Sequence, residues 1–152
     1  MAAATTYSST NSDRSFPILV VEDNPEHQLM IRYGLEQRFA QAKPIFVRTA
    51  DQALAYLQAS ARKEVVSIRL VLLDIYLPKP EIGWQLLTTI RQTYPYLPVI
   101  AVSSYQAAED VQKAYVLGVH SFIAKPMSME QWINYFDMLR IYWLETVTLP
   151  II

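Results

Sequence analysis

The sequence predicts an α/β fold, in which a doubly wound sheet of five parallel strands is covered by five helices. Five short apolar runs alternate along the chain with five segments of helical periodicity, which is typical of a parallel sheet with crossover helices. Some of these runs lack polar residues altogether, as expected for strands that are covered on both faces.

Helix-start signals mark the first two strand and helix units. Residues 18–21 form the first apolar run, and Asn24 and Pro25 then supply a helix cap and a proline at the first helical position. The second run, residues 45–47, is followed by Thr49 and, three positions later, by a glutamine, which together form a capping box. Each run is therefore expected to be a strand that leads into a helix.

The remaining three units follow the same pattern. Strands are expected at residues 70–73, 99–102 and 121–124. Helices are expected after Gly83, over residues 107–117 with Gly118 as the stop, and from Ser128 to about residue 145. Five such units fit a flavodoxin-like sheet with the strand order 2-1-3-4-5.

The length and composition of the chain limit the kinds of protein that it can be. A length of 152 residues fits one domain, with residues 1–15 as a disordered polar tail and residues 16–152 as the folded part. The net charge of −1 gives no support for binding nucleic acid or an anionic membrane. The chain has no cysteine and no apolar stretch of the roughly 20 residues that a membrane span needs. We therefore expect a cytoplasmic protein without thiolate chemistry.

Five residues with chemically useful side chains stand just beyond strand ends. Glu22 and Asp23 follow the first strand, Asp74 the third, Ser103 the fourth and Lys125 the fifth. Because the carboxyl ends of parallel strands share one edge, these side chains are expected in one crevice. Three carboxylates there repel one another unless they share a cation, and oxygen ligands favour Mg²⁺ or Mn²⁺. The hydroxyl and the ammonium then offer donors to an anion, as in a phosphoryl-transfer site.

The motifs around these residues resemble those of response-regulator receiver domains, the phospho-acceptor modules of two-component signalling. The resemblance rests on VVEDN, LLDIYLP, PVIAVSS and SFIAKP, and it extends over about residues 16–145. The separations also follow the family's pattern: Ser103 comes 29 residues after Asp74, and Lys125 comes 22 residues after Ser103.

The resemblance implies a role for each acid. Asp74 accepts a phosphoryl group from a histidine kinase or a phosphotransfer protein. Mg²⁺, or Mn²⁺ in its place, is bound by Asp23, Asp74 and the backbone carbonyl of Tyr76, and Glu22 belongs to the metal site largely through a bound water.

The resemblance also implies a phosphoryl-binding and switching set. Ser103 hydrogen-bonds the phosphoryl group, Lys125 pairs with it, and Phe122 turns inward when the site is phosphorylated. The peptide bond before Pro126 is expected to be cis, which proline makes possible at modest cost. The readout face is formed by the fourth helix, the fifth strand and the fifth helix. Phe122 could equally be an ordinary core residue.

The function expected from this resemblance is that of a stand-alone receiver, which binds a partner or relays phosphate. Such a protein is not an enzyme in the ordinary sense, although it takes part in its own phosphorylation and dephosphorylation. One alternative is a pseudo-receiver that acts without phosphate. A phosphatase with an aspartyl-phosphate intermediate would need a second acid where Tyr76 stands, and a flavin carrier would need a phosphate-binding loop where the acids stand.

Two tyrosines stand two positions beyond Asp74 and Ser103, at places that flank the phosphoryl group in receivers. We hypothesise that the rings of Tyr76 and Tyr105 exclude the hydrolytic water and so prolong the phosphorylated state. The alternative is that both are surface residues at the rim of the site.

The last helix is apolar nearly all round, more than a helix with one face on a sheet requires. Its ending, YWLETVTLP, resembles that of phytochrome-associated single-domain receivers, which dimerise through this region. A homodimer would cover the surplus rings. The expected interface consists of Trp132, Tyr135, Phe136, Tyr142 and Trp143. The alternative is that the carboxyl-terminal tail, residues 146–152, folds back over them.

Overall fold

A computed structural model describes residues 15–150 of the chain. It contains one sheet of five parallel strands in the order β2-β1-β3-β4-β5, which confirms the predicted topology. The strands are β1 (Phe16–Val21), β2 (Ala42–Val47), β3 (Leu70–Asp74), β4 (Val99–Ser103) and β5 (Ser121–Ala124). The tail predicted for residues 1–15 lies outside the described residues, apart from Ser15.

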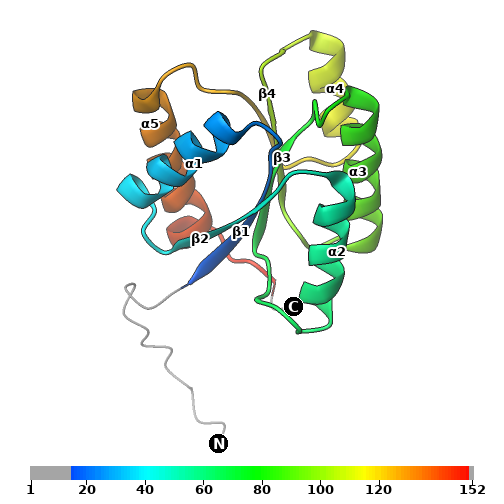
Figure 1. The fold of residues 1–152 in the computed structure, drawn as a ribbon, viewed down its shortest axis with the longest axis horizontal. Coiled ribbons are helices and arrows are strands. Elements are labelled where there is room, and N and C mark those ends of the chain that lie inside the picture. Colours follow the sequence, from blue (N-terminus) through cyan, green and yellow to red (C-terminus); the bar gives the residue numbers. More distant parts are fainter. Residues whose placement is uncertain (1–14, 151–152) are drawn as a thin grey trace, which may run out of the picture.

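Five α-helices cover the sheet, and a short π-helical segment follows the last of them. They are α1 (Pro25–Arg38), α2 (Ala50–Ala61), α3 (Pro80–Thr93), α4 (Ala108–Val116), α5 (Met129–Arg140) and the π-helix η1 (Ile141–Thr146). In Figure 1, α1 and α5 lie on one face of the sheet, and α2, α3 and α4 lie on the other. Within the described residues, no helix combines the length and the apolar character that a membrane crossing requires.

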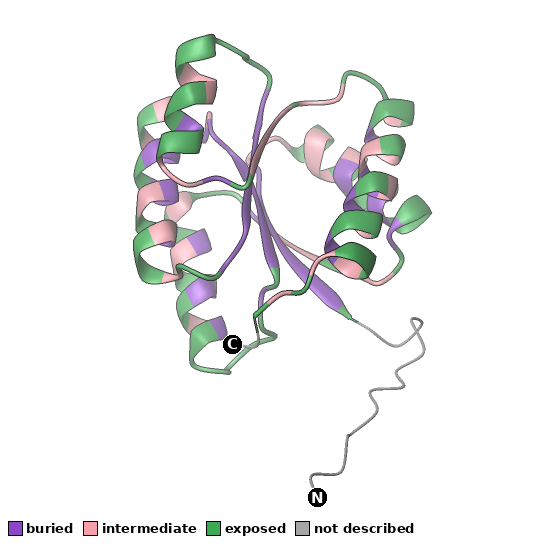
Figure 2. Ribbon diagram, turned by 180° about the vertical axis from the view of Figure 1, so that it is seen from behind, coloured by how far each residue is buried: buried purple, intermediate pink, exposed green. Residues whose placement is uncertain are grey.

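Each face of the sheet has its own hydrophobic core. In β1, Leu19 and Val21 pack toward α2 and α3, whereas Ile18 and Val20 pack toward α1 and α5. Successive side chains point to opposite faces of a strand, so a strand with helices on both sides needs apolar residues at every position. The uninterrupted apolar runs of the sequence are therefore the buried strands in Figure 2.

The predicted helix caps are present. The side-chain oxygen of Asn24 accepts hydrogen bonds from the backbone N–H groups of Glu26 and His27 at the start of α1. Thr49 caps α2, and Ser128 caps α5, each by accepting a bond from the backbone N–H three residues later. These caps satisfy donors that the helix itself cannot use.

Two element boundaries differ from the prediction. The second strand begins at Ala42 rather than at residue 45, because Lys43 and Pro44 are paired with β1 at the edge of the sheet, where proline is tolerated. The third helix begins at Pro80, so Gly83 lies inside it. A Cβ atom at Gly83 would lie 1.9 Å from the carbonyl oxygen of Ile75, which explains why the close approach of helix and strand needs glycine here.

The rings at the carboxyl end of the chain are mostly buried within the monomer. Trp132, Phe136 and Trp143 belong to the core beneath α1 and α5, and Val147 and Leu149 of the tail pack against the same cluster. These three rings are therefore core residues rather than the exposed interface that was predicted. The alternative of tail coverage fits Trp143, because Val147 and Leu149 line one pocket with it, whereas Trp132 lines another pocket with Glu22 and Asp74.

Candidate metal centre

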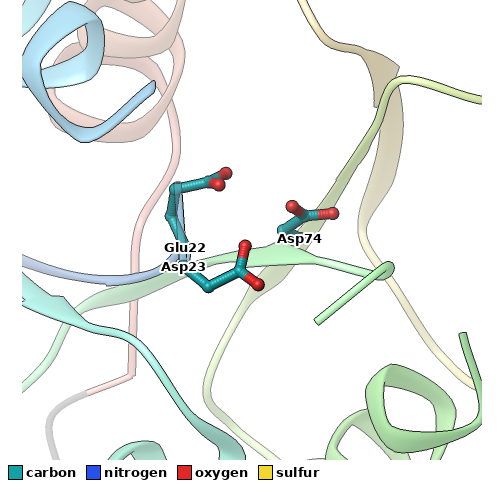
Figure 3. Close-up of side chains that lie close together, drawn as sticks. All are labelled: Glu22, Asp23 and Asp74. Atoms are coloured by element: carbon teal, nitrogen blue, oxygen red, sulfur yellow. The ribbon is translucent and has the colours of Figure 1, made fainter. Parts of the chain in front are cut away.

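Three carboxylates converge where β1 and β3 leave the sheet. Glu22 and Asp23 follow β1, and Asp74 is the last residue of β3, which pairs directly with β1. One oxygen from each residue lies within 4.8 Å of the others. Figure 3 shows the three side chains directed toward a common space. The predicted acidic cluster is therefore confirmed as a geometric fact.

Burial makes this concentration of negative charge costly. Glu22 is 2% exposed and Asp74 is 6% exposed, while Asp23 is half-buried. Burial raises the pKa of Glu22 above its usual value, and the negative charge of Asp74 acts in the same direction, while the hydrogen bond from Lys125 opposes both. The Glu22 carboxylate thus gains from any further positive charge placed nearby.

The donor set fits a hard divalent cation. Three acidic side chains and one ammonium leave an excess of negative charge in a partly enclosed pocket. Carboxylate oxygens without nitrogen or sulfur ligands suit Mg²⁺ or Mn²⁺, which are bound through a few carboxylates with several waters retained. Glu22, Asp23 and Asp74 are the residues that would hold such an ion.

Lys125 reaches into the same cluster from the end of β5. Its Nζ atom lies 2.8 Å from Oε2 of Glu22 and 3.0 Å from Oδ2 of Asp74, and its side chain is almost buried. Its backbone N–H donates to the carbonyl of Ser103, which extends the pairing of β5 with β4 and aims the side chain at the acids. The structure thus brings Lys125 to the position that the sequence predicted.

The predicted cis peptide bond before Pro126 is wrong. Among the described residues the cis bond is the one between Leu77 and Pro78, in the loop after Asp74. An X–Pro bond accepts either isomer at small cost, so the sequence does not decide which proline is cis. Lys125 reaches both carboxylates with the Lys125–Pro126 bond in the trans form.

Ser103 is the last residue of β4 and is fully buried. Its hydroxyl oxygen accepts a hydrogen bond from the backbone N–H of Tyr105 at 3.0 Å. Because β4 pairs with β3, with Val102 beside Asp74, Ser103 lies at the same edge of the sheet as the acids. The neighbouring Ser104 is exposed.

Two tyrosine rings lie against each other beside Asp74. The backbone N–H of Tyr76 donates to Oδ1 of Asp74 at 3.0 Å, and the ring of Tyr76 lies 4.7 Å from that of Tyr105, centre to centre. The Tyr76 hydroxyl donates to Oδ2 of Asp110, in the first turn of α4, at 3.0 Å. This bond to an acid raises the pKa of Tyr76. The two rings are thus in contact with each other, and Tyr105 is exposed to solvent, so both the water-exclusion hypothesis and the alternative of rim residues stay open.

Phe122 is half-buried in β5 and packs against the core on the α2, α3 and α4 side. Its backbone N–H donates to the hydroxyl oxygen of Tyr115 in α4 at 3.2 Å. This position fits both predictions made for Phe122, because a half-buried ring is part of the core and also has room on one side.

Sequence reasoning missed two residues that contact the site. His27 has no metal-ligand spacing to the other histidine and is expected from the sequence to be a structural or surface residue, yet its Nδ1 atom lies 2.8 Å from Nζ of Lys125. The available signal was its place in the first turn of the helix that follows the acid pair. Asp110, the partner of Tyr76, gave no signal, because it lies 34 residues away and looks like an ordinary helix-dipole residue.

Comparison with known proteins gives a consistent result. The family model of the response regulator receiver domain matches residues 18–137. Response regulator Rcp1 of a Synechocystis species is 30% identical over 145 residues, which cover 91% of this chain and 98% of Rcp1. These shares mean that the similarity extends over nearly the whole of both chains.

Two solved structures share the fold closely. The phosphorylated cyanobacterial phytochrome response regulator RcpA has a TM-score of 0.78 at 29% identity, over 90% of this chain and 99% of RcpA. The Mn²⁺-bound form of Rcp1 has a TM-score of 0.77 at 28% identity, with the same coverage. Together with the converging acids and Lys125, these matches show that the chain belongs to the response regulator receiver domain family and is a response regulator of the Rcp1 type.

Proposed function

We propose that Asp74 is the phospho-acceptor of this receiver, in a reaction that depends on Mg²⁺ and draws on a histidine kinase or a phosphotransfer protein. The observation that carries the proposal is the convergence of Glu22, Asp23, Asp74 and the Lys125 ammonium in one pocket. Support also comes from two relatives, since RcpA is described as phosphorylated and Rcp1 as bound to Mn²⁺.

In the proposed reaction a carboxylate oxygen of Asp74 attacks the phosphorus of the donor. A new O–P bond forms to Asp74 while the bond between phosphorus and the donor's leaving group breaks, and that group keeps the electron pair. Oδ1 of Asp74 is held by the N–H of Tyr76, and Oδ2 by Lys125, so the carboxylate is oriented before the donor arrives. A divalent ion, held by the three acids and the carbonyl of Tyr76, would neutralise the phosphoryl oxygens when bound.

Lys125 and Ser103 complete the phosphoryl site in this proposal. The ammonium of Lys125 is already within hydrogen-bonding distance of Asp74, so it can donate to a phosphoryl oxygen once Asp74 is phosphorylated. Ser103 is buried at the next strand end, and its hydroxyl proton can be donated to a phosphoryl oxygen while its oxygen still accepts from Tyr105.

Movement of the Ser103 loop would pass the signal to α4 and β5. The added charge draws Ser103 toward Asp74, which leaves space for Phe122 to change rotamer. The partner-binding face would then consist of α4, β5 and α5. Only contacts that differ between the two states can shift this equilibrium, and the contact between Ser103 and the phosphoryl group is such a contact.

A homodimer remains part of the proposal, with a revised interface. Met138, Ile141 and Tyr142 are exposed apolar residues on α5 and η1, and Tyr135 is half-buried on the same helix. A contact between two copies would cover these side chains, while Trp132, Phe136 and Trp143 stay in the core.

Intact-mass measurement tests the phospho-acceptor proposal. The parent protein, Asp74→Asn and the control Asp51→Asn, which changes an exposed acid on α2, are incubated with acetyl phosphate and Mg²⁺. The parent and the control should gain the mass of one phosphoryl group, and Asp74→Asn should not. An equal gain in all three proteins would remove Asp74 from this role.

A further inference from the structure

The ammonium of Lys125 has three hydrogen-bond partners within 3.0 Å. Two are the carboxylates of Glu22 and Asp74, at 2.8 and 3.0 Å. The third is Nδ1 of His27, at 2.8 Å. An ammonium group has three N–H donors, so each donor has one acceptor and the direction of the group is fully determined.

The chemistry of the pair fixes which atom donates in the contact between Lys125 and His27. An ammonium can only donate, so Nδ1 is the acceptor in this 2.8 Å contact. Nδ1 is also 3.6 Å from Oε1 of Glu22, but an atom that accepts from Lys125 has no proton to donate to that carboxylate. In this arrangement His27 supplies an acceptor without adding a negative charge to a pocket that already holds three acids.

The backbone at His27 is fixed by the same turn that forms the acidic site. The N–H of His27 donates to the Asn24 cap, and the N–H of Asn24 donates to Oε1 of Glu22. The side chain of Gln28 donates to the carbonyl of Glu22 at 2.6 Å. These hydrogen bonds hold the backbone of His27 in place relative to Glu22, and so they limit where the His27 ring can lie relative to Lys125.

We propose that His27 is a positioning residue that holds the Lys125 ammonium in line with Asp74 for phosphoryl transfer. The inference rests on the proposed function, because it deepens the role assigned to Lys125. A carboxylate at position 27 would add a fourth negative charge, whereas an apolar side chain would leave one ammonium donor without its protein acceptor. A neutral acceptor satisfies the donor and leaves the charge balance of the pocket unchanged.

Two substitutions separate the acceptor role of His27 from simple packing. His27→Asn is smaller than histidine but carries a carbonyl oxygen near the place of Nδ1. His27→Leu fills a similar volume and has no acceptor. Leu29→Ala is the control, because Leu29 lies on the same helix and its side chain is 67% exposed. Melting temperatures of all variants identify any general loss of folding.

The first measurement is the rate of Asp74 phosphorylation by acetyl phosphate at saturating Mg²⁺. We expect His27→Leu to lower the maximal rate about tenfold with an unchanged half-saturating donor concentration, because orientation of Lys125 acts in the transition state. His27→Asn should remain within about twofold of the parent, since it keeps the hydrogen bond. A His27→Leu variant as fast as the parent, or faster than His27→Asn, would overturn the inference.

The second measurement needs no phosphoryl transfer and no metal. A hydrogen-bonded, almost buried ammonium exchanges its protons slowly, so Lys125 should give its own ¹H–¹⁵N ammonium signal, assigned by its loss in Lys125→Arg. The signal should persist in His27→Asn and Leu29→Ala and vanish in His27→Leu. Its persistence in His27→Leu would refute the role of His27 even if Asp74 is phosphorylated. If the parent gains no phosphate, the proposed function fails, and this signal alone decides the role of His27.

Discussion

Helices α3 and α4 lie on the same face of the sheet but are held very differently. Helix α3 buries five residues, namely Gly83, Trp84, Leu86, Leu87 and Ile90, whereas α4 buries Ala114 alone. Helix α4 is also shorter, with 9 residues against 14 in α3. The difference indicates that α3, which follows the loop after Asp74, is held by a larger buried face than α4, so we expect α4 to be the easier of the two helices to displace.

The weakly packed helix is nevertheless linked to the site by specific bonds. The hydroxyl of Tyr76, two residues after Asp74, donates to Asp110 in the first turn of α4. The hydroxyl of Tyr115 accepts from the backbone of Phe122 in β5. Helix α4 is therefore positioned by a few polar contacts that a change near Asp74 could break or remake, which fits the readout face proposed above.

The largest expected effect tests the difference in packing between α3 and α4. Leu87→Ala in α3 should lower the free energy of unfolding by about 3 kcal/mol, because it leaves a cavity at a fully buried position. Val116→Ala in α4, at a side chain that is 79% exposed, should change it by about 0.5 kcal/mol or less. Urea denaturation measures both values. Equal losses would show that α4 is packed as firmly as α3.

The second prediction concerns Glu22 and the pH dependence of Mg²⁺ binding. Mg²⁺ binds the charged form of Glu22, while burial raises the pKa of this group and so favours the protonated form. The affinity for Mg²⁺ should therefore be highest at pH values above the raised pKa of Glu22. As the pH drops through this pKa, the affinity should fall by at most about tenfold per pH unit for this group. Calorimetric titration of Mg²⁺ over a pH series measures this slope, and Glu22→Gln should make it shallower. An equal slope in both proteins would contradict this assignment.

The third prediction tests the hypothesis that the rings of Tyr76 and Tyr105 exclude water from the phosphoryl group. Tyr76→Asn removes one ring of the contact with Tyr105, so water should reach the phosphoryl group more easily and phosphate loss should accelerate about fivefold. The decay of the phosphorylated protein is followed by intact mass, with Tyr142→Asn as a control far along the chain. A decay rate unchanged from the parent would end the water-exclusion hypothesis.

The smallest expected effect tests the bond between the site and α4. Tyr76→Phe keeps the ring but removes the donor to Asp110, so amides of residues 108–116 should exchange about threefold faster while those of α3 stay unchanged. Tyr105→Phe is the matched control, since its ring also lies in the pair. If α4 and α3 respond alike to Tyr76→Phe, the hydroxyl is not a specific link to α4.

The sequence predicted the parts of the molecule that depend on local chemistry. The strand at residues 70–73, the cap at Asn24 and the convergence of Glu22, Asp23 and Asp74 all follow from patterns within a few residues, once the strands are known to be parallel. The start of α3 was misplaced, because glycine at position 83 looks like a boundary, whereas it is needed for a close approach to Ile75.

The features that the sequence did not predict depend on contacts between distant residues. His27 and Lys125 are 98 residues apart, and only the folded sheet brings Nδ1 to Nζ. The bond from Tyr76 to Asp110 is of the same kind. The cis bond at Pro78 rather than Pro126 is a choice between two nearly equal isomers, which local sequence does not decide. Trp132 is buried because α5 packs against the sheet and α1, so that it shares one cluster with residues as distant as Ile31 and Leu72.

Mn²⁺ soaking of crystals, followed by anomalous diffraction, tests the central claim most directly. We predict one strong anomalous peak at ligand distance from the carboxylates of Glu22, Asp23 and Asp74, and its loss in Asp23→Asn. A map without a peak among these three side chains, at Mn²⁺ concentrations that saturate a known receiver, would contradict the claim that they form a metal centre for phosphoryl transfer.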